Sequence, residues 1–401
     1  MTVSVLRRPS AAPAHGPVGQ PLRVVSVSHS AVRHNAARKR YELLASDPTL
    51  DLTVVVPKVW HEYGKAEYAE PSRTALKIHV EPARLTRGGP AKWYLHHYPK
   101  LRDVLARLRP DVIHLWEEPW SIAALQASRL RDRMAPGAAL VLETDQNIAR
   151  RLPAGFERIR RYTLARTDLL IARGDEALQV SRRHGFAGPA EFVMYGIDAE
   201  VFHPRPRPER PAGSPFRLGY VGRLVPEKGL DDVLAALHRS PADIELLLLG
   251  DGPEREGLLA RAAGMGLGGR VRMMSPCSPA GVAEFMSTLD ALVLMSRTTR
   301  TWKEQFGRVI MEAHACGVPV IGSSSGSIPS VVGNCGWIVP EGDATALAAL
   351  LTGLAAAPDQ VAAVAAACNS EVMRRFGYPV VSADLRRAWV RAAAARRGAA
   401  A

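Results

Sequence analysis

The chain lacks a long apolar run. Across its 401 residues, no stretch approaches the roughly 20 consecutive apolar residues that span a bilayer. The opening MTVSVLRRPSAAPAHGPVGQ also lacks the apolar core of a secretory signal, so residues 1–20 are expected to be a disordered leader. Cysteines are few, and Cys277, Cys316, Cys335 and Cys368 form neither a CxxC pair nor a zinc spacing. These absences favour a cytoplasmic protein with reduced thiols.

Acidic residues are outnumbered. The chain has 39 carboxylates against 52 lysines and arginines, a formal charge of +13. A positive charge of this size is typical of proteins whose partner is a nucleic acid, an anionic membrane surface, or an anionic small molecule such as a nucleotide. Because the basic residues are spread out, with no zinc finger and no platform that combines aromatic and basic residues, nucleic acid is not expected as a partner.

The densest basic cluster is RRLPAGFERIRRYTLAR, residues 150–166. It is predicted to form a helix with Phe156, Ile159 and Ala165 on its apolar face and arginines 158, 160 and 161 elsewhere. A solvated helix face is the plain interpretation, and a patch that touches a membrane or an acceptor is the alternative.

The length predicts two domains of roughly 150 to 200 residues. Short apolar runs alternate with helical patterns, and runs this apolar are typical of parallel strands covered on both faces. Each half is therefore predicted to be an α/β unit with a doubly wound sheet. The runs are 23–28, 52–56, 77–80, 111–115, 139–143 and 168–172 in the first half, and 216–222, 244–250, 271–274, 291–295 and 318–322 in the second.

The proline-rich stretch HPRPRPERPAGSP, residues 203–215, predicts a linker, since proline cannot donate to a sheet. We expect both sheets to turn the carboxyl ends of their strands toward one cleft, where ligands of such folds bind. The segment MYGIDAEVFHP, residues 194–204, is expected to cross between the domains and serve as a hinge. The predicted divisions are 21–195 (first domain), 196–215 (linker and hinge), 216–375 (second domain) and 376–401 (final helix and frayed tail).

Two motifs in the second half follow predicted strands. GRLVPEKGL, residues 222–230, places Arg223 and Lys228 where both can converge on one anionic group such as a diphosphate, and two surface cations are the alternative. LLLLGDGPERE, residues 246–256, contains Gly250 and Gly252, which let the backbone approach either a ligand or the neighbouring chain.

A third motif, EQFGRVIMEAHACGVPVIG, spans residues 304–322. The helix is predicted to begin at Phe306-Gly307, so Glu304 lies in the loop before it and Glu312 inside it. If all eight intervening steps were helical, the two carboxylates would stand about 12 Å apart, a separation suited to the two ends of one extended ligand. Free amides at the helix start favour a phosphate, and the carboxylates favour hydroxyls, so the motif indicates a nucleotide sugar.

Together these motifs resemble the retaining GT4 family of nucleotide-sugar glycosyltransferases, which adopt the GT-B architecture of two Rossmann-like domains facing across a cleft. The resemblance covers residues 22–390 and is stronger in the second half. It implies transfer of a hexose, or a derivative of one, to a hydroxyl of a small-molecule or glycan acceptor. A UDP-sugar is the favoured donor and GDP-mannose the next, with no metal and no other cofactor.

The resemblance also implies roles for matching positions. Arg223 and Lys228 would neutralise the departing diphosphate, and Glu304 would hold the sugar; these three form the predicted catalytic set. Glu312 would accept from the ribose hydroxyls. In this family the new bond forms on the face that the nucleotide leaves, without a general base of the usual kind. The full predicted donor set is Gly222, Arg223, Lys228, Gly250, Gly252, Glu304, Phe306, Gly307, Val309 and Glu312.

Candidate acceptor contacts lie in the first half. SVSHSAVRHNAARKRYELL, residues 26–44, and DVIHLWEEPW, residues 111–120, supply them, with ordinary loop and helix polar residues as the alternative. Trp116 stands where relatives often have a histidine facing the sugar, which suggests stacking on a sugar face or a different acceptor. TDQN, residues 144–147, is a weaker candidate. The predicted set is His29, Asn35, Arg38, His114, Trp116, Glu117 and Glu118.

Two further functions stay open from sequence alone. The basic charge and residues 150–166 fit a lipid mannosyltransferase that uses GDP-mannose at the inner membrane face. A GT-B scaffold that binds a nucleotide or a protein without transferring sugar is the alternative from another class. Oligomeric state is left open.

Overall fold

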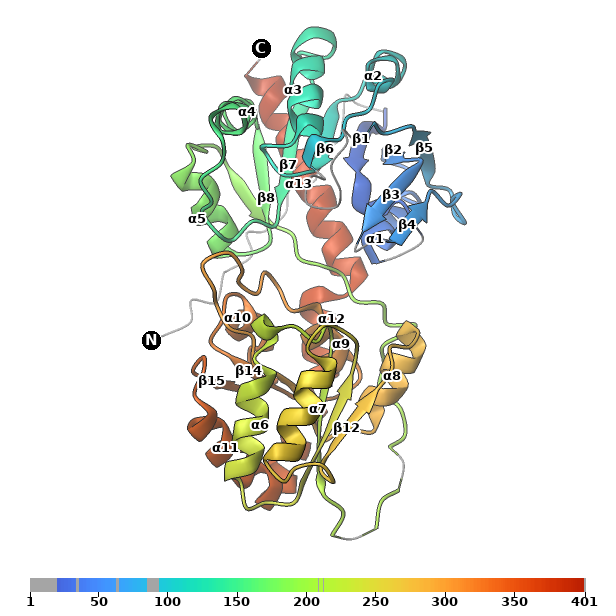
Figure 1. Ribbon diagram of the computed structural model, residues 1–401. Coiled ribbons are helices and arrows are strands. Elements are labelled where there is room, and N and C mark those ends of the chain that lie inside the picture. Colours follow the sequence, from blue (N-terminus) through green and yellow to red (C-terminus); the bar gives the residue numbers. More distant parts are fainter. Residues whose placement is uncertain are drawn as a thin grey trace.

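The computed structural model describes residues 20–33, 36–62, 65–84, 94–207, 209–211 and 213–399. Nearly all of the expected leader, and Asn35, lie outside these ranges. Figure 1 shows two stacked domains, with the first half of the chain forming one and most of the second half forming the other.

The first domain is built on a seven-stranded parallel sheet in the order β5-β2-β1-β6-β7-β8-β9. In β1, Val24 packs into one apolar core while Val25 and Val27 pack into another, so both faces of the sheet are covered, as predicted. The strands are β1 (Leu22–Ser28), β2 (Leu50–Pro57), β5 (Lys77–Glu81), β6 (Val112–Trp116), β7 (Ala139–Thr144), β8 (Leu169–Ala172) and β9 (Ala190–Phe192).

Helices lie on both faces of this sheet. Helices α2 and α3 contribute to one core, and α1 contributes to the other. An antiparallel hairpin of β3 (Val59–Glu62) and β4 (Lys65–Tyr68), which the sequence did not suggest, stands apart from the main sheet. The helices are α1 (Ala36–Leu44), α2 (Leu101–Leu108), α3 (Ile122–Met134), α4 (Ala154–Leu164) and α5 (Asp175–Arg183).

The second domain has a six-stranded parallel sheet in the order β12-β11-β10-β13-β14-β15. Every strand predicted for this half is present, and one strand, β15, was not predicted. The strands are β10 (Phe216–Val221), β11 (Ile244–Leu249), β12 (Val271–Met274), β13 (Ala291–Leu294), β14 (Val320–Ser323) and β15 (Gly336–Val339). The helices are α6 (Leu230–Arg239), α7 (Arg255–Gly264), α8 (Pro279–Ser287), α9 (Arg308–Ala315), α10 (Ile328–Val332), α11 (Ala344–Ala356) and α12 (Pro358–Phe376).

Two glycine turns of the second domain pack directly on each other. A Cβ added at Gly250 would lie 1.9 Å from the carbonyl oxygen of Gly222, and one at Gly252 would lie 2.3 Å from that of Leu224. Contacts this short are impossible, so glycine is required at both positions by the neighbouring chain. Of the two reasons that the sequence left open for these glycines, close approach of the neighbouring backbone is the one that the structure supports.

The final helix α13 (Tyr378–Gly398) returns to the first domain, which the sequence did not predict. Leu385 and Trp389 belong to the same apolar core as strands β1, β6 and β7, and the Trp389 ring is stacked on Tyr41 of α1 at 6.4 Å. A final helix was predicted for residues 376–401, but its packing on the first domain was not; successive turns of α13 bury apolar side chains that cover one face of the first sheet.

The chain crosses between the domains at two adjacent places. The amide of Ile197 donates to the carbonyl of Phe376 at 2.9 Å, which joins the predicted crossing segment to the return leading into α13. Packing is tight here, since a Cβ at Gly196 would lie 2.2 Å from the Tyr378 ring. The hinge role of residues 194–204 stays a prediction.

Among the described residues, no single helix is long and apolar enough to cross a membrane. Helices α11 and α12 pass that test only as a pair, and they are bent by 95° relative to each other.

Trp389→Ala should destabilise the protein by about 3 to 5 kcal/mol, since it leaves a cavity between α13 and the first sheet. The matched control is Arg387→Ala on the exposed side of the same helix, which should change stability by less than about 0.5 kcal/mol. Urea unfolding of both variants measures the difference. Equal midpoints for the two variants would show that α13 is not part of the first core.

Candidate active site

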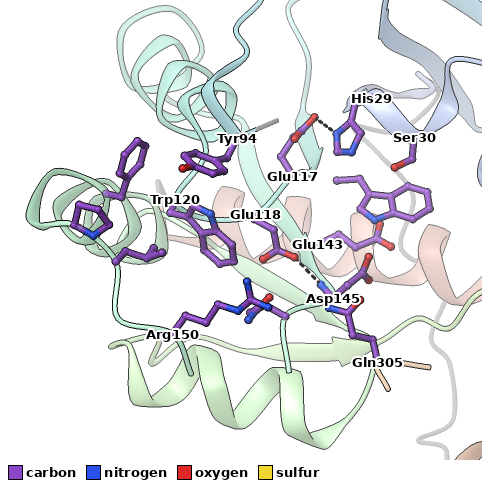
Figure 2. A pocket seen from close by; sticks show the side chains of 15 residues that line it. His29, Ser30, Tyr94, Glu117, Glu118, Trp120, Glu143, Asp145, Arg150 and Gln305 are labelled. Atoms are coloured by element: carbon purple, nitrogen blue, oxygen red, sulfur yellow. Dashed lines mark hydrogen bonds and ion pairs between the residues drawn. The ribbon is translucent and has the colours of Figure 1, made fainter. Parts of the chain in front are cut away.

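A cavity of about 540 Å³ opens beside the carboxyl ends of β1, β6 and β7, at the edge of the first domain that faces the second. Figure 2 shows carboxylates, a histidine and aromatic rings around it. Gln305 brings the second domain into its wall. The lining residues are His29, Ser30, Tyr94, Trp116, Glu117, Glu118, Trp120, Glu143, Asp145, Gln146, Arg150, Leu152, Pro153, Phe156 and Gln305.

Several predicted acceptor residues meet in this cavity. His29, Trp116, Glu117 and Glu118 line it, together with Asp145 and Gln146 of the TDQN segment. Tyr94, Trp120 and Gln305 also line it, although no role was predicted for them. Gln305 follows Glu304 directly, and this adjacency to a recognised motif was the one signal that pointed to it.

The basic cluster was misjudged in part. Phe156 lines the cavity, a position compatible with the alternative of a patch that touches an acceptor, but Arg160 is buried rather than solvated. Arg160 donates to the carbonyl of Arg150 at 3.2 Å and pairs with Glu157. The buried face of α4 therefore contains an arginine, which the apolar pattern did not reveal.

Two predicted acceptor residues lie outside the cavity. His114 is fully buried, with its Nδ1 2.9 Å from the hydroxyl of Ser26 and its Nε2 3.0 Å from the carboxylate of Glu143. Arg38 is also fully buried and donates to the carbonyl oxygens of Ala31 and Val32. The structure does not bring these two side chains to the cavity, because they hydrogen-bond to groups inside the first domain.

Trp116 lines the cavity but does not offer its ring for stacking on a sugar. The Arg40 guanidinium lies over the ring at 3.9 Å from its centroid, and Arg173 lies at 4.9 Å. The ring is 6% exposed. The suggestion of sugar stacking is therefore not supported: Trp116 instead packs against buried cations beneath the pocket.

These cations surround a buried carboxylate. Glu143 is bonded to Arg40 at 2.7 Å, to Arg173 and to His114. Burial alone would raise the pKa of Glu143, but the charges of Arg173 and Arg40 hold that pKa well below its usual range. The carboxylate is thus ionised and fully paired, which fixes the floor of the pocket.

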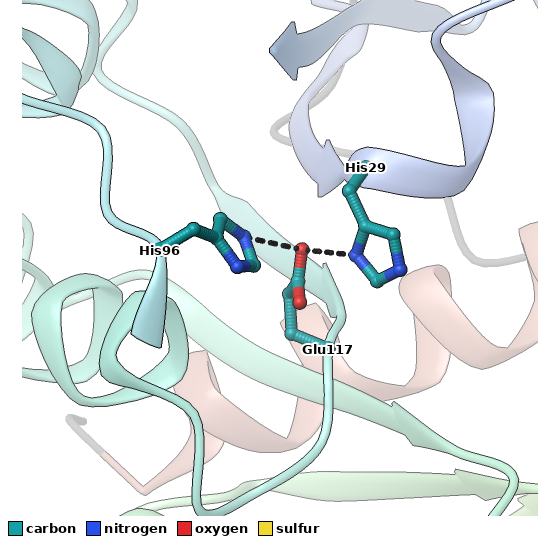
Figure 3. Close-up of side chains that lie close together, drawn as sticks. All are labelled: His29, His96 and Glu117. Carbon is teal, nitrogen blue, oxygen red and sulfur yellow. Dashed lines mark hydrogen bonds and ion pairs between the residues drawn. The ribbon is translucent and has the colours of Figure 1, made fainter. Parts of the chain in front are cut away.

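Glu117 links two histidines. Its Oε1 lies between Nδ1 of His29 at 2.8 Å and Nε2 of His96 at 3.2 Å (Figure 3). Burial penalises the carboxylate, but the two imidazoles outweigh this and lower the pKa of Glu117 to about 2. Although the three polar atoms all lie within 4.8 Å of one another, the oxygen is between the two nitrogens, as hydrogen bonds require.

Glu118, beside it, is in the opposite state. Burial and then the nearby charge of Asp145 raise the pKa of Glu118 to about 8. The hydroxyl of Thr144 donates to its carboxyl group at 2.6 Å and the amide of Asp145 at 3.1 Å. Near neutral pH this side chain is mostly protonated, so it can donate a hydrogen bond from the pocket wall.

On the side of the second domain, two of the motifs meet. Nζ of Lys228 lies 2.6 Å from Oε2 of Glu304, and the Ser296 hydroxyl donates to the same oxygen at 2.8 Å. The Lys228 ammonium is also 4.8 Å from the centroid of Trp302. Two residues 76 positions apart in the chain therefore form an ion pair in this region.

The remaining donor candidates surround this pair. Arg223 is exposed, and Gly307, the N-cap residue directly before α9, has a φ of 75°, which glycine adopts easily. The Phe306 ring is buried against Tyr195 at 5.1 Å, so only its backbone can serve a ligand. Glu312 is half-buried within α9, and burial raises its pKa. Val309, also half-buried, packs on the second core.

First-domain side chains hold the loop that carries Glu304. The Asn147 amide donates to the Glu304 carbonyl at 3.1 Å, and Lys303 pairs with Glu176 at 2.6 Å. Arg150 donates to the carbonyl of Thr301. The cavity of the first domain and the charged pair of the second are therefore neighbours across one cleft.

Comparison with known proteins agrees with this arrangement. Residues 205–366 match the family model described as glycosyl transferases group 1. A D-inositol 3-phosphate glycosyltransferase of Mycobacterium marinum is 33% identical over 201 residues, which cover 46% of this chain and 41% of that protein. The D-inositol 3-phosphate glycosyltransferase of Mycolicibacterium paratuberculosis is 33% identical over 209 residues, which cover 49% of this chain and 46% of that protein. The match thus spans less than half the length of these curated relatives.

Solved structures match nearly the whole chain. A sucrose-phosphate synthase from Thermosynechococcus elongatus superposes with a TM-score of 0.69 at 20% identity, covering 93% of this chain and all of that one. Anabaena HepE, solved in complex with UDP and glucose, gives a TM-score of 0.66 at 17% identity, covering 91% and 98%. The predicted GT-B fold and the resemblance to glycosyltransferases are confirmed.

Glu118→Gln should stabilise the protein, and increasingly so as pH rises. Folded protein keeps a proton on Glu118 that the unfolded chain releases, so wild-type stability falls between about pH 4.5 and about pH 8. The neutral glutamine removes this loss. The Tm of Glu118→Gln should therefore exceed that of wild type by an amount that grows from pH 5 to pH 8. Each kcal/mol of stabilisation corresponds to roughly 2 to 4 °C in Tm.

The matched control is Glu256→Gln, an exposed substitution on α7 that should change stability by less than about 0.5 kcal/mol. If Glu118→Gln instead melts below wild type at pH 8, its carboxyl group is ionised and needed in that form.

Proposed function

We propose that this chain, whose second domain matches the group 1 glycosyl transferases, transfers a hexose or hexose derivative from a nucleotide diphosphate sugar to an acceptor hydroxyl. The observation that carries the proposal is the Lys228–Glu304 pair, 2.6 Å apart, beside a cavity of about 540 Å³ that both domains line. A cation for a diphosphate and a carboxylate for sugar hydroxyls stand together next to a space for an acceptor.

The pair suggests how the donor is held. Lys228, with Arg223, would neutralise the charge that develops on the diphosphate as it departs. Glu304 would exchange its bond to Lys228 for bonds to the sugar hydroxyls, while the amides of Phe306 and Gly307 face the same ligand at the start of α9. Glu312, inside α9, would accept from the ribose. The buried core around Phe306 keeps these groups in place.

The finer points of the proposal rest on the resemblance. They are retention of anomeric configuration, independence of metal ions and preference for a UDP-sugar, with GDP-mannose as the second donor. The UDP in the Anabaena HepE complexes supports the choice of base. The acceptor is a small molecule or a glycan, and peripheral contact with a membrane is the alternative setting for it.

Lys228→Ala and Glu304→Gln should each lower the transfer rate about a hundredfold, since each removes one group that stabilises charge or positions the donor. Lys77→Ala is the matched control: Lys77 also pairs with a carboxylate, Asp51, but on the outer surface of the first domain. Release of nucleoside diphosphate from UDP-glucose and GDP-mannose, with a panel of sugar acceptors, measures the rates. Unchanged turnover in Lys228→Ala or Glu304→Gln would refute the proposed site.

Products made from an α-linked donor should carry an α-linkage, and excess chelator should leave the rate unchanged. Proton NMR of the purified product reads the anomeric configuration directly. A β-linked product would contradict retention, and loss of activity on chelation that returns with a divalent ion would contradict metal independence. Both results are compatible with glycosyl transfer itself, so they test the finer points alone.

A further inference from the structure

A second cavity lies at the opposite end of the first domain. It has a volume of about 840 Å³ and opens at the amino ends of β1, β6 and β7, whereas the candidate active site lies at their carboxyl ends. Because β1 has seven residues, and a strand rises about 3.3 Å per residue, the two cavities are roughly 20 Å apart. The described residues that line this second cavity take no part in the proposed donor or acceptor sites.

Arginines dominate its wall. Within the described ranges, the charged lining residues are Arg23, Arg102, Arg109, Arg133 and a single carboxylate, Asp111. Helices α2 and α3 lie next to each other at this end of the domain (Figure 1). Arg102 and Arg109 are seven positions apart, or two helical turns, so they lie on one side of α2, and Arg133 lies in the last turn of α3. Three guanidinium groups from two helices therefore line the same space.

Arg109 has an unusual backbone conformation. It is the C-cap residue of α2, and its φ of 43° is in the left-handed region. Glycine or asparagine adopts this conformation more easily than arginine, whose Cβ crowds the following carbonyl oxygen. Among the residues that the structure describes, Arg109 is the one residue other than glycine with a positive φ. An unfavourable conformation of this kind indicates a function for the side chain, and here the side chain lines the cavity.

Asp111 neutralises one of the arginines. Arg23 donates from Nη2 to Oδ1 of Asp111 at 3.0 Å and from Nε to Oδ2 at 3.1 Å. Burial alone would raise the pKa of Asp111, but these hydrogen bonds and the charges of Arg23 and Arg397 lower it. Arg397, in the last turn of α13, therefore brings a fifth guanidinium group near the cavity.

The other three arginines leave a surplus of positive charge. Arg102, Arg109 and Arg133 are exposed, and they form no ion pair or side-chain hydrogen bond with any residue that the structure describes. Cations often occur at the carboxyl end of a helix only because that end carries about half a negative charge. The ends of α2 and α3 together offset about one positive charge, so about two of the three remain uncompensated. This surplus favours a ligand with two negative charges.

The size and lining of the cavity indicate what such a ligand contains. Guanidinium groups bind phosphate through paired N–H donors, so several around one space suit a diphosphate or two separate phosphates. A volume of about 840 Å³ is typical of small-molecule sites. No aromatic ring is among the described lining residues, so a nucleobase would find no stacking partner there. Leu130 and Met134 of α3 form an apolar part of the wall for the rest of the ligand.

We propose that this cavity binds a small molecule that carries two phosphate groups. The site is separate from the proposed donor site, since Lys228 and Glu304 lie in the second domain and this cavity lies at the far end of the first (Figure 1). Glycosyl transfer is not needed for binding here, which depends on the three arginines without a described partner. A bound ligand would contact α2, α3 and the start of β1, whose other end leads to the candidate active site.

Isothermal titration calorimetry with inorganic pyrophosphate tests the site. Pyrophosphate could also bind at Lys228, so every protein in the comparison carries Lys228→Ala. Adding Arg102→Ala and Arg133→Ala together should weaken binding about 10- to 100-fold relative to the Lys228→Ala parent, since each arginine supplies charge-assisted hydrogen bonds. Arg109→Asn, which suits the left-handed conformation but removes the charge, should weaken binding about tenfold without lowering the Tm.

The matched control removes two exposed arginines of α4, Arg158→Ala with Arg161→Ala. It lowers the net charge equally and should bind pyrophosphate as the parent does. The proposal is overturned if the parent does not bind pyrophosphate. It is also overturned if the control loses as much affinity as the variant without Arg102 and Arg133, because net charge alone would then explain the binding.

Sedimentation with phosphatidylglycerol vesicles distinguishes a free phosphate compound from a lipid headgroup. The parent should bind pyrophosphate and stay in the supernatant. If it instead binds the vesicles through Arg102 and Arg133 and does not bind pyrophosphate, this end of the domain is a membrane contact and the small-molecule site is refuted.

Discussion

The contact between Lys228 and Glu304 joins the two motifs on which the proposed donor site depends. An ion pair this close to a cleft contributes little net stability, because removing both charges from water costs about as much as their attraction returns. Its value lies in position: the two groups come from different βα loops of one sheet, and the loop that carries Glu304 is hydrogen-bonded to the first domain. A bound diphosphate sugar can break this ion pair, because its diphosphate can bind Lys228 while its sugar hydroxyls bind Glu304.

The first domain supplies the opposite wall, and its precision comes from buried charge. Glu143, Arg40, Arg173 and His114 form a paired network below the pocket. Because an unpaired buried charge is costly, these side chains have few alternative arrangements. The network covers the face of Trp116 and leaves the upper wall to His29, Glu117 and Glu118. Two neighbouring glutamates thereby reach opposite protonation states, one held by histidines and the other by burial.

Much of the fold followed from sequence, since buried parallel strands read as short apolar runs and every such run became a strand. The donor motifs were also readable, because they follow strands directly. Three features were not. The domain on which α13 packs depends on which sheet has an uncovered apolar face, and no local sequence pattern shows this. His114 looked like a ligand contact because burial cannot be seen in a motif. The cluster around Glu117 includes His96, which is distant in sequence and has no motif of its own.

The most direct test of the central claim is a crystal structure of the protein with a non-hydrolysable UDP-hexose analogue. The account predicts that the Lys228 ammonium lies on the diphosphate, that the Glu304 carboxylate has left it for the hexose hydroxyls, and that the hexose faces the pocket beside His29. A nucleotide bound elsewhere, with Lys228 and Glu304 still paired, would contradict it.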